Sequence, residues 1–142
     1  MKDISTIDYA ILDRPEVLMF LFHPRPEPTV SPFQTAEPET RMAGQKDILI
    51  PVQAEIAVGA RFHMAEKSGG NLLFFHGNGE IVADYDELGA VYNQVGINLL
   101  AVDYRGYGRS GGKPTVTAMM RDCHSIFHFV RKWLQKNNYT GP

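Results

Sequence analysis

The chain has 142 residues, 44% of them hydrophobic and 21% charged, which is typical of one soluble globular domain with a sizeable core. Its formal net charge of -2 gives no reason to expect a nucleic acid or an anionic membrane surface as a partner. The single cysteine, Cys123, excludes an internal disulfide framework and favours a reducing compartment, so we expect a cytoplasmic protein.

The first 44 residues are expected to form a lead-in segment rather than a domain. Their start lacks the basic region and apolar core of a signal peptide. The apolar run at residues 17–22 is far shorter than the roughly 20 residues that cross a bilayer, so we expect no transmembrane segment and interpret the run as docked on the core. Prolines at 24, 26, 28, 32 and 38 block regular structure, which predicts an extended arm along the surface.

From Asp47 onward the sequence has the pattern of strands. Short apolar segments at 48–50 and 56–58, followed by alternation at 61–65, predict an antiparallel β-hairpin. After a turn at 68–70, the continuous apolar run at 71–76 is typical of a strand that is buried on both faces.

The second half of the chain alternates between helix and strand patterns. Apolar residues recur at helical spacing before a stop at Gly96: Tyr85, Leu88, Tyr92 and Val95. Residues 97–103 are expected to form another buried strand, and a second amphipathic helix is expected at about 115–136. This order predicts an α/β fold in which helices cover a largely parallel sheet.

The five residues 108–112, Gly-Arg-Ser-Gly-Gly, match the G-x-S-x-G pattern of a serine hydrolase nucleophile. That motif needs the serine on a sharp turn directly between a strand and a helix. Here the strand is expected to end near Asp103, well before Ser110, and two glycines and Pro114 delay the next helix. We therefore interpret Ser110 as a loop hydroxyl that bonds local backbone.

Two further patterns are interpreted as structural. Residues 106–111 match the G-x-G-x-x-G of dinucleotide-binding loops, but the glycines begin too far beyond the strand, so we expect no cofactor and assign them to positive φ angles. His124 and His128 are spaced for one helix face, yet no further ligand accompanies them, so we expect packing or surface roles and no metal.

His76-Gly77-Asn78-Gly79 is the strongest candidate site. Ligands gather at the carboxyl edge of parallel strands, where this segment is expected to lie. Glycines on both sides let the Asn78 backbone approach a substrate oxygen and offer its N–H to developing negative charge. The alternative, a plain tight turn, stays open at this point.

The segments NLLFFHGNGE (71–80) and INLLAVDYRGYGRSGGKPT (97–115) together resemble the α/β-hydrolase superfamily, in particular the prolyl-oligopeptidase-like hydrolases that include esterases and protein depalmitoylases. The resemblance covers roughly residues 45–142. It implies a three-layer α/β/α, partial α/β-hydrolase fold with a mostly parallel sheet: a β-hairpin, then strands 3 and 4 with helices A and B. Residues 1–44 would be the lead-in segment, and residues 45–142 the N-terminal half of the domain, ending before the nucleophile strand.

The resemblance also implies the site residues. The backbone N–H of Asn78 corresponds to one half of an oxyanion hole, and His76, Gly77 and Gly79 form the turn that presents it. The loop after strand 4 shapes the fold and contributes no nucleophile; its matching residues are Asp103, Arg105, Gly106, Gly108 and Ser110. We expect a serine hydrolase acting on an ester, thioester or amide bond of a small-molecule or acylated substrate. Its nucleophile, acid and histidine would lie beyond residue 142, so the chain alone is expected to be inactive.

A missing fifth strand would leave residues 72–75 at an edge of the sheet. Such an apolar edge has unpaired N–H and C=O groups and is a predicted association site. We therefore expect a C-terminal complementing segment or self-association through this edge, and poor stability of the chain alone. The alternative function is a non-catalytic half-domain that associates with a partner chain.

Overall fold

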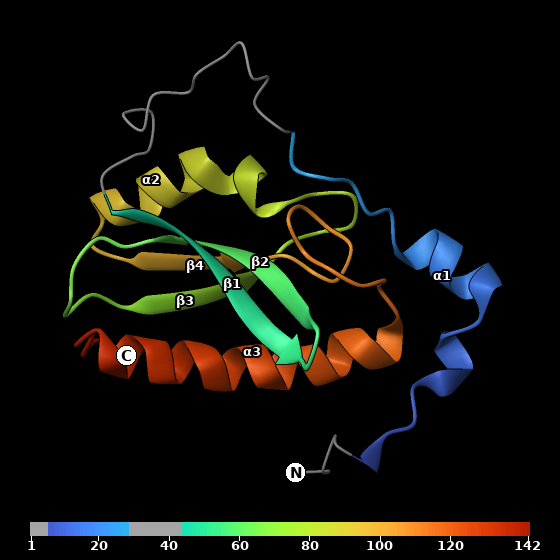
Figure 1. The fold of residues 1–142 in the computed structure, drawn as a ribbon. Helices are drawn as coiled ribbons and strands as arrows, with labels where there is room; N and C mark the ends of the chain where they lie inside the picture. Colours follow the sequence, from blue (N-terminus) through green and yellow to red (C-terminus); the bar gives the residue numbers. More distant parts are fainter. Residues whose placement is uncertain (1–5, 29–43) are drawn as a thin grey trace.

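The computed structural model describes residues 6–28 and 44–142. A four-stranded sheet lies between two helical layers, with α2 on one face and α3 on the other (Figure 1). The strands are β1 Gln45–Gln53, β2 Ile56–His63, β3 Asn71–Phe75 and β4 Asn98–Val102. The helices are η2 Ala10–Leu12, α1 Pro15–Leu21, η4 Val82–Tyr85, α2 Asp86–Gln94 and α3 Val116–Lys136. The expected α/β class and three-layer arrangement are confirmed.

The sheet has the strand order β1-β2-β4-β3. β1 and β2 form the expected antiparallel hairpin, and β2 also pairs antiparallel with β4. Among the described strands only β3 and β4 run parallel, with Leu73 opposite Leu100. The sheet is therefore mixed rather than mostly parallel, because a hairpin connection forces antiparallel pairing and only the strand–helix–strand unit adds a parallel pair.

The core lies between the two central strands and α3. All five residues of β4 are buried, and the inward residues of β2 and α3 close the cluster around them. The ring of Phe62 meets Trp133 of α3 edge to face, with the ring centroids 5.0 Å apart. Apolar burial of this kind is the main stabilising term of a small domain.

Both long helices occur where the apolar periodicity predicts them. Thr115 precedes α3, and its hydroxyl oxygen accepts the N–H of Ala118, which satisfies one of the free donors at the start of the helix. The short helix η4 leads into α2, which gives way to Gly96 in the left-handed conformation with φ +76.

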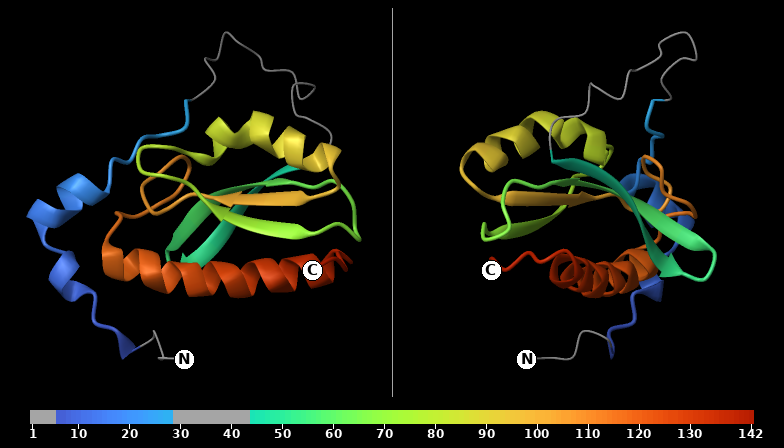
Figure 2. Two further views of the ribbon diagram at one scale, coloured as in Figure 1. Left: turned by 180° about the vertical axis from the view of Figure 1, so that it is seen from behind. Right: turned by 60° about the vertical axis from the view of Figure 1, so that its left-hand side comes forward.

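The N-terminal segment departs from expectation. No residue of α1 is buried, and Met19 and Phe20 are 62% and 73% exposed, so the predicted docking of this apolar run on the core is wrong. The segment runs past the N-terminal end of α3 (Figure 2), where Asp13 accepts the backbone N–H of Thr117. Residues 29–41 of the predicted proline-rich arm fall outside the described residues. Among the described helices, none has the length and apolar character needed to cross a bilayer.

Candidate functional site

The segment after β3 forms a tight turn at the carboxyl edge of the sheet. The Glu80 N–H donates to the carbonyl of Gly77 at 3.3 Å, and Gly79 has φ +78 while Asn78 does not have positive φ. These features define a type II turn with glycine at the position that requires it. A Cβ on Gly77 would lie 2.8 Å from the Glu80 carboxylate, so both glycines have a structural reason to be there.

The Glu80 carboxylate closes the turn from the other side. It accepts the N–H of Gly77 at 2.7 Å and the hydroxyl of Tyr85. The Tyr85 hydrogen bond, with help from the Gly77 N–H, lowers the pKa of Glu80. Burial, together with the Glu80 carboxylate, raises the pKa of Tyr85 to about 12. Near neutral pH, Glu80 is therefore an ionised carboxylate that is hydrogen-bonded to the neutral phenol of Tyr85.

His76 anchors the turn to the core. Its Nε2 lies 3.0 Å from Oδ1 of Asp103, and neither side chain is exposed. Its Nδ1 lies 2.8 Å from the carbonyl of Gly77, and the Tyr104 hydroxyl donates to the His76 carbonyl. Asp103 also accepts the N–H of Val82 at the start of η4. This buried pair joins the ends of β3 and β4 and the start of η4 at one point.

Asn78 is exposed, and its side chain and backbone have different roles. Its side chain is bonded to His23 and Tyr107, whereas its backbone N–H has no hydrogen-bond partner within residues 6–28 and 44–142. A backbone N–H that is held in place and left open is the arrangement that stabilises an anionic oxygen. The predicted segment His76–Gly79 is thus one structural unit, with Asn78 at its tip.

Ser110 lies in the loop between the end of β4 and the start of α3, away from any strand–helix corner. Its hydroxyl oxygen accepts the N–H of Gly59 in β2 at 2.8 Å. The partner is therefore a distant strand, not the local backbone that we expected. No histidine is bonded to Ser110 in the described part of the chain.

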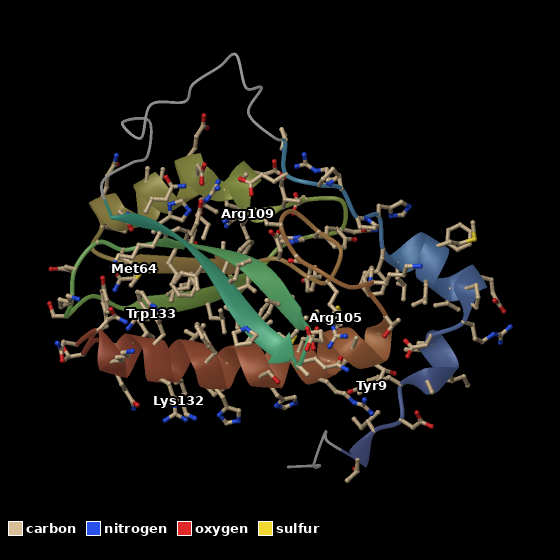
Figure 3. The ribbon with its side chains drawn as sticks, viewed as in Figure 1. Tyr9, Met64, Arg105, Arg109, Lys132 and Trp133 are labelled. Atoms are coloured by element: carbon tan, nitrogen blue, oxygen red, sulfur yellow. The ribbon has the colours of Figure 1, made fainter. Side chains whose placement is uncertain are left out.

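The loop after β4 is fixed to the fold by charge and by glycines. Arg105 forms two hydrogen bonds to Asp122 of α3, at 2.6 and 2.7 Å, and Figure 3 shows its side chain beside the start of that helix. Gly106 and Gly108 have φ +77 and +55, as the positive-φ interpretation requires, whereas Gly111, the third glycine of the pattern, does not have positive φ. A Cβ on Gly108 would come within 2.2 Å of the Asp103 carboxylate.

The paired histidines of α3 lie on the surface. His124 and His128 are both exposed, and the described residues contain no group of three or more ligating side chains that could hold a metal ion.

Sequence reasoning missed three residues at this site: His23, Arg25 and Tyr107. His23 and Arg25 contact the turn at Asn78 and Gly79, which follow them by more than 50 residues. The hydroxyl of Tyr107, which is 1% exposed, donates to Asn78 at 3.0 Å. No local periodicity reports such long-range contacts; the only available signal was the position of Tyr107 in the glycine-rich loop.

Comparison with known proteins relates this chain to hydrolases. The family described as serine aminopeptidase, S33, matches residues 66–140. The chain is 35% identical over 66 residues to the multifunctional-autoprocessing repeats-in-toxin of Vibrio cholerae, a match that covers 44% of this chain and 1% of the toxin. It is 36% identical over 64 residues to alpha/beta hydrolase domain-containing protein 17C of Xenopus laevis, covering 42% of this chain and 20% of that protein.

Two solved structures share the fold. ESTFA, in its FE-lacking apo form, superposes with a TM-score of 0.55 at 16% identity, over 99% of this chain and 42% of that one. The esterase Pf2001 of Pyrococcus furiosus superposes with a TM-score of 0.50 at 21% identity, over 82% of this chain and 43% of that one. The chain thus spans less than half the length of each of these relatives.

Proposed function

The chain belongs to the serine aminopeptidase S33 family of the α/β-hydrolase superfamily, and from this premise we propose that it forms part of a serine hydrolase. The bond it cleaves is an ester, thioester or amide of a small-molecule or acylated substrate. The backbone N–H of Asn78 is one donor of the oxyanion hole, presented by His76, Gly77 and Gly79. No cofactor or metal is needed for this chemistry.

The proposal is carried by one observation, the Asn78 N–H that has no partner in the described part of the chain. It lies at the carboxyl edge of β3, on a type II turn that is fastened to the core through His76 and Asp103. A donor that is already oriented costs no reorganisation when charge develops on the substrate oxygen. Loss of one such donor costs about 2.7–4 kcal/mol of transition-state stabilisation.

The nucleophile, its base and the supporting acid lie outside these 142 residues in this proposal. The Ser110 hydroxyl oxygen accepts the Gly59 N–H, and the His76 ring is fully buried, with Nδ1 2.8 Å from the Gly77 carbonyl and Nε2 3.0 Å from Oδ1 of Asp103. The buried His76 ring is therefore not placed to take a proton from a serine. The chain by itself is accordingly expected to be inactive.

The assignment of Asn78 to the oxyanion hole is tested by a variant that lacks the backbone N–H of residue 78 but keeps the conformation of the turn. Proline suits the second position of a type II turn, so Asn78→Pro deletes the donor with little strain, and Asn78→Ala is the matched control that keeps it. The protein is expressed from its own gene, with whatever sequence accompanies residues 1–142, and assayed on p-nitrophenyl esters. We expect kcat in Asn78→Pro to fall about 10²–10³-fold below that of the unchanged protein and to stay clearly below that of Asn78→Ala, which keeps the N–H and loses only the side-chain amide. Equal turnover in the two variants would contradict the assignment.

The placement of the nucleophile has its own test. The 142-residue chain is treated with a fluorophosphonate probe and with p-nitrophenyl esters, and we expect neither labelling nor hydrolysis. Ester hydrolysis by this chain that disappears in Ser110→Ala would overturn the placement.

A second candidate role, association through β3, rests on the unpaired edge of the sheet. β3 ends the strand order, and the Asn71 N–H donates away from β4, to the carbonyl of Pro142 at 2.7 Å. The backbone N–H and C=O groups of a strand point alternately to its two sides. Those of Leu73 and Phe75 therefore point away from β4, as those of Asn71 do, and no described strand pairs with them there. Beside this edge is a groove of about 430 Å³ that includes Leu73 and Phe127.

An additional strand from a complementing segment or a second copy would satisfy this edge. Sedimentation velocity of the 142-residue chain tests the role. Leu73→Pro removes one outward N–H and leaves the pairing with β4 intact, since proline is tolerated where an edge N–H faces outward. We expect concentration-dependent association in the unchanged chain and a weaker one in Leu73→Pro. A chain that is monomeric at every concentration and does not bind ANS would exclude this role.

A further inference from the structure

An extended N-terminal segment, residues 23–27, which we call the arm, lies across the turn that carries Asn78. We propose that His23 and Arg25 are positioning residues that hold this turn in the one orientation in which the Asn78 N–H faces a substrate oxygen. This inference rests on the proposed role of Asn78 and adds to it a distant part of the chain.

Both polar atoms of the Asn78 side-chain amide are hydrogen-bonded, to His23 of the arm and to Tyr107. Its Oδ1 accepts the backbone N–H of His23 at 2.9 Å and the hydroxyl of Tyr107 at 3.0 Å. Because a backbone N–H can only donate, the amide orientation is determined, and Nδ2 faces Nδ1 of His23 at 2.8 Å. The His23 imidazole must therefore accept at Nδ1 and carry its proton on Nε2.

Arg25 holds the next residue of the turn. Its Nε donates to the carbonyl of Gly79 at 2.9 Å, and its guanidinium pairs with Asp84. Asp84 in turn accepts the N–H of Ile81 at 3.0 Å. The hydrogen bond from Arg25 lowers the pKa of Asp84, so the pair stays ionised near neutral pH. Asn78 and Gly79 are thus held from outside the turn by neighbouring residues of the arm.

The arm itself is tied to the loop after β4. Gly108 donates its N–H to the carbonyl of Arg25 at 2.9 Å, and Glu27 donates its N–H to the carbonyl of Gly108 at 3.2 Å. The carboxylate of Glu27 pairs with Arg61 at 2.7 Å and with Arg109 at 3.0 Å. Figure 3 shows Arg109 on the α2 side of the sheet, where these charges meet. These contacts fix the position of the arm relative to the sheet, and therefore also relative to the turn.

The turn needs such support because of its own sequence. Glycines on both sides of Asn78 allow the backbone to approach a substrate, but they also give the free turn many alternative conformations. Its backbone hydrogen bond, 3.3 Å from the Glu80 nitrogen to the Gly77 carbonyl oxygen, is slightly longer than usual, and the bond from the Gly77 N–H to the Glu80 carboxylate does not hold Asn78 itself. Contacts from the arm remove this freedom before substrate binds, and a preoriented donor acts without reorganisation.

The first test measures the turn without any catalysis. In the 142-residue chain, His23→Ala removes the acceptor for the Asn78 amide, and His23→Asn returns an acceptor near the same place. Tyr107→Phe removes one donor and keeps the ring, and His128→Ala is the control at an exposed histidine on α3. We expect the ¹⁵N order parameter of Asn78 to fall from about 0.85 toward 0.6 in His23→Ala and Tyr107→Phe. It should recover in His23→Asn and stay unchanged in His128→Ala.

The second test measures the consequence for the reaction. In the protein expressed from its own gene, His23→Ala should lower kcat by about tenfold to a hundredfold at unchanged KM, because a misplaced donor weakens the transition state alone. His23→Asn should restore most of the loss. An order parameter that does not change in His23→Ala and Tyr107→Phe would overturn the inference, and so would a changed order parameter with unchanged kcat. Failure of the proposed function is a separate result, namely normal turnover in Asn78→Pro.

Discussion

Replacement of Gly108 by alanine should destabilise the fold through one defined contact. Gly108 has φ +55, and a Cβ at this position would lie 2.2 Å from Oδ2 of Asp103. The carboxylate has nowhere to move, since it is fully buried, faces Nε2 of His76 at 3.0 Å and accepts the Val82 N–H at 2.9 Å. The variant therefore strains the same pair that fastens the candidate site to the core.

The size of the effect follows from two contributions. Alanine in the left-handed region costs about 1–2 kcal/mol, and forcing an atom into a packed interior costs about 1–3 kcal/mol more. Gly79→Ala is a matched control, because Gly79 has φ +78 and its Cβ would meet nothing within 4 Å. Both variants lose the same glycine entropy in the unfolded chain, so that effect cancels in the comparison. The difference between them isolates the contact with Asp103.

Urea unfolding followed by circular dichroism at 222 nm measures both variants. We expect Gly79→Ala to lose about 1 kcal/mol of unfolding free energy and Gly108→Ala about 3 kcal/mol, the latter moving the midpoint by more than about 1 M urea. Equal midpoints for the two variants would show that the Asp103 carboxylate does not lie against Gly108, and the account of the buried pair would have to be abandoned.

Two further predictions concern the core. Phe62→Ala should reduce the free energy of unfolding by about 3–5 kcal/mol, because the ring is fully buried against Trp133; Leu49→Ala, at a side chain 57% exposed, is the control, and a similar loss in both would contradict the packing. Burial lowers the pKa of His63 below its ordinary 6.5, an effect that the nearby Asp86 partly opposes. The folded state therefore disfavours the charged ring, so stability should be highest above pH 6.5 and fall as the pH drops through the lowered pKa. Urea midpoints at pH 7.5 and 5.5 should differ less in His63→Gln than in the unchanged chain, and an identical pH dependence would exclude His63 as a cause.

The sequence determined the local elements and the place of the candidate turn. Apolar spacing alone predicts the helix that occurs as Val116–Lys136, and the doubly apolar runs predict β3 and β4. These patterns are reliable because a helix face or a buried strand is encoded within a few neighbouring residues. The His-Gly-Asn-Gly segment was recognisable for the same reason, since its glycines report a turn after a buried strand.

The tertiary structure decided what lies beside these elements. Periodicity cannot tell that the hairpin joins the sheet at β4 and makes it mixed, that Ser110 bonds Gly59, or that α1 leaves Phe20 exposed. Nor does it place His23 on Asn78, 55 positions away. Such contacts depend on how the whole chain packs, because their hydrogen bonds form only after distant segments have been brought together. The local sequence does not show which distant residues meet in the folded chain. The contacts that orient Asn78 are therefore visible only in the tertiary structure.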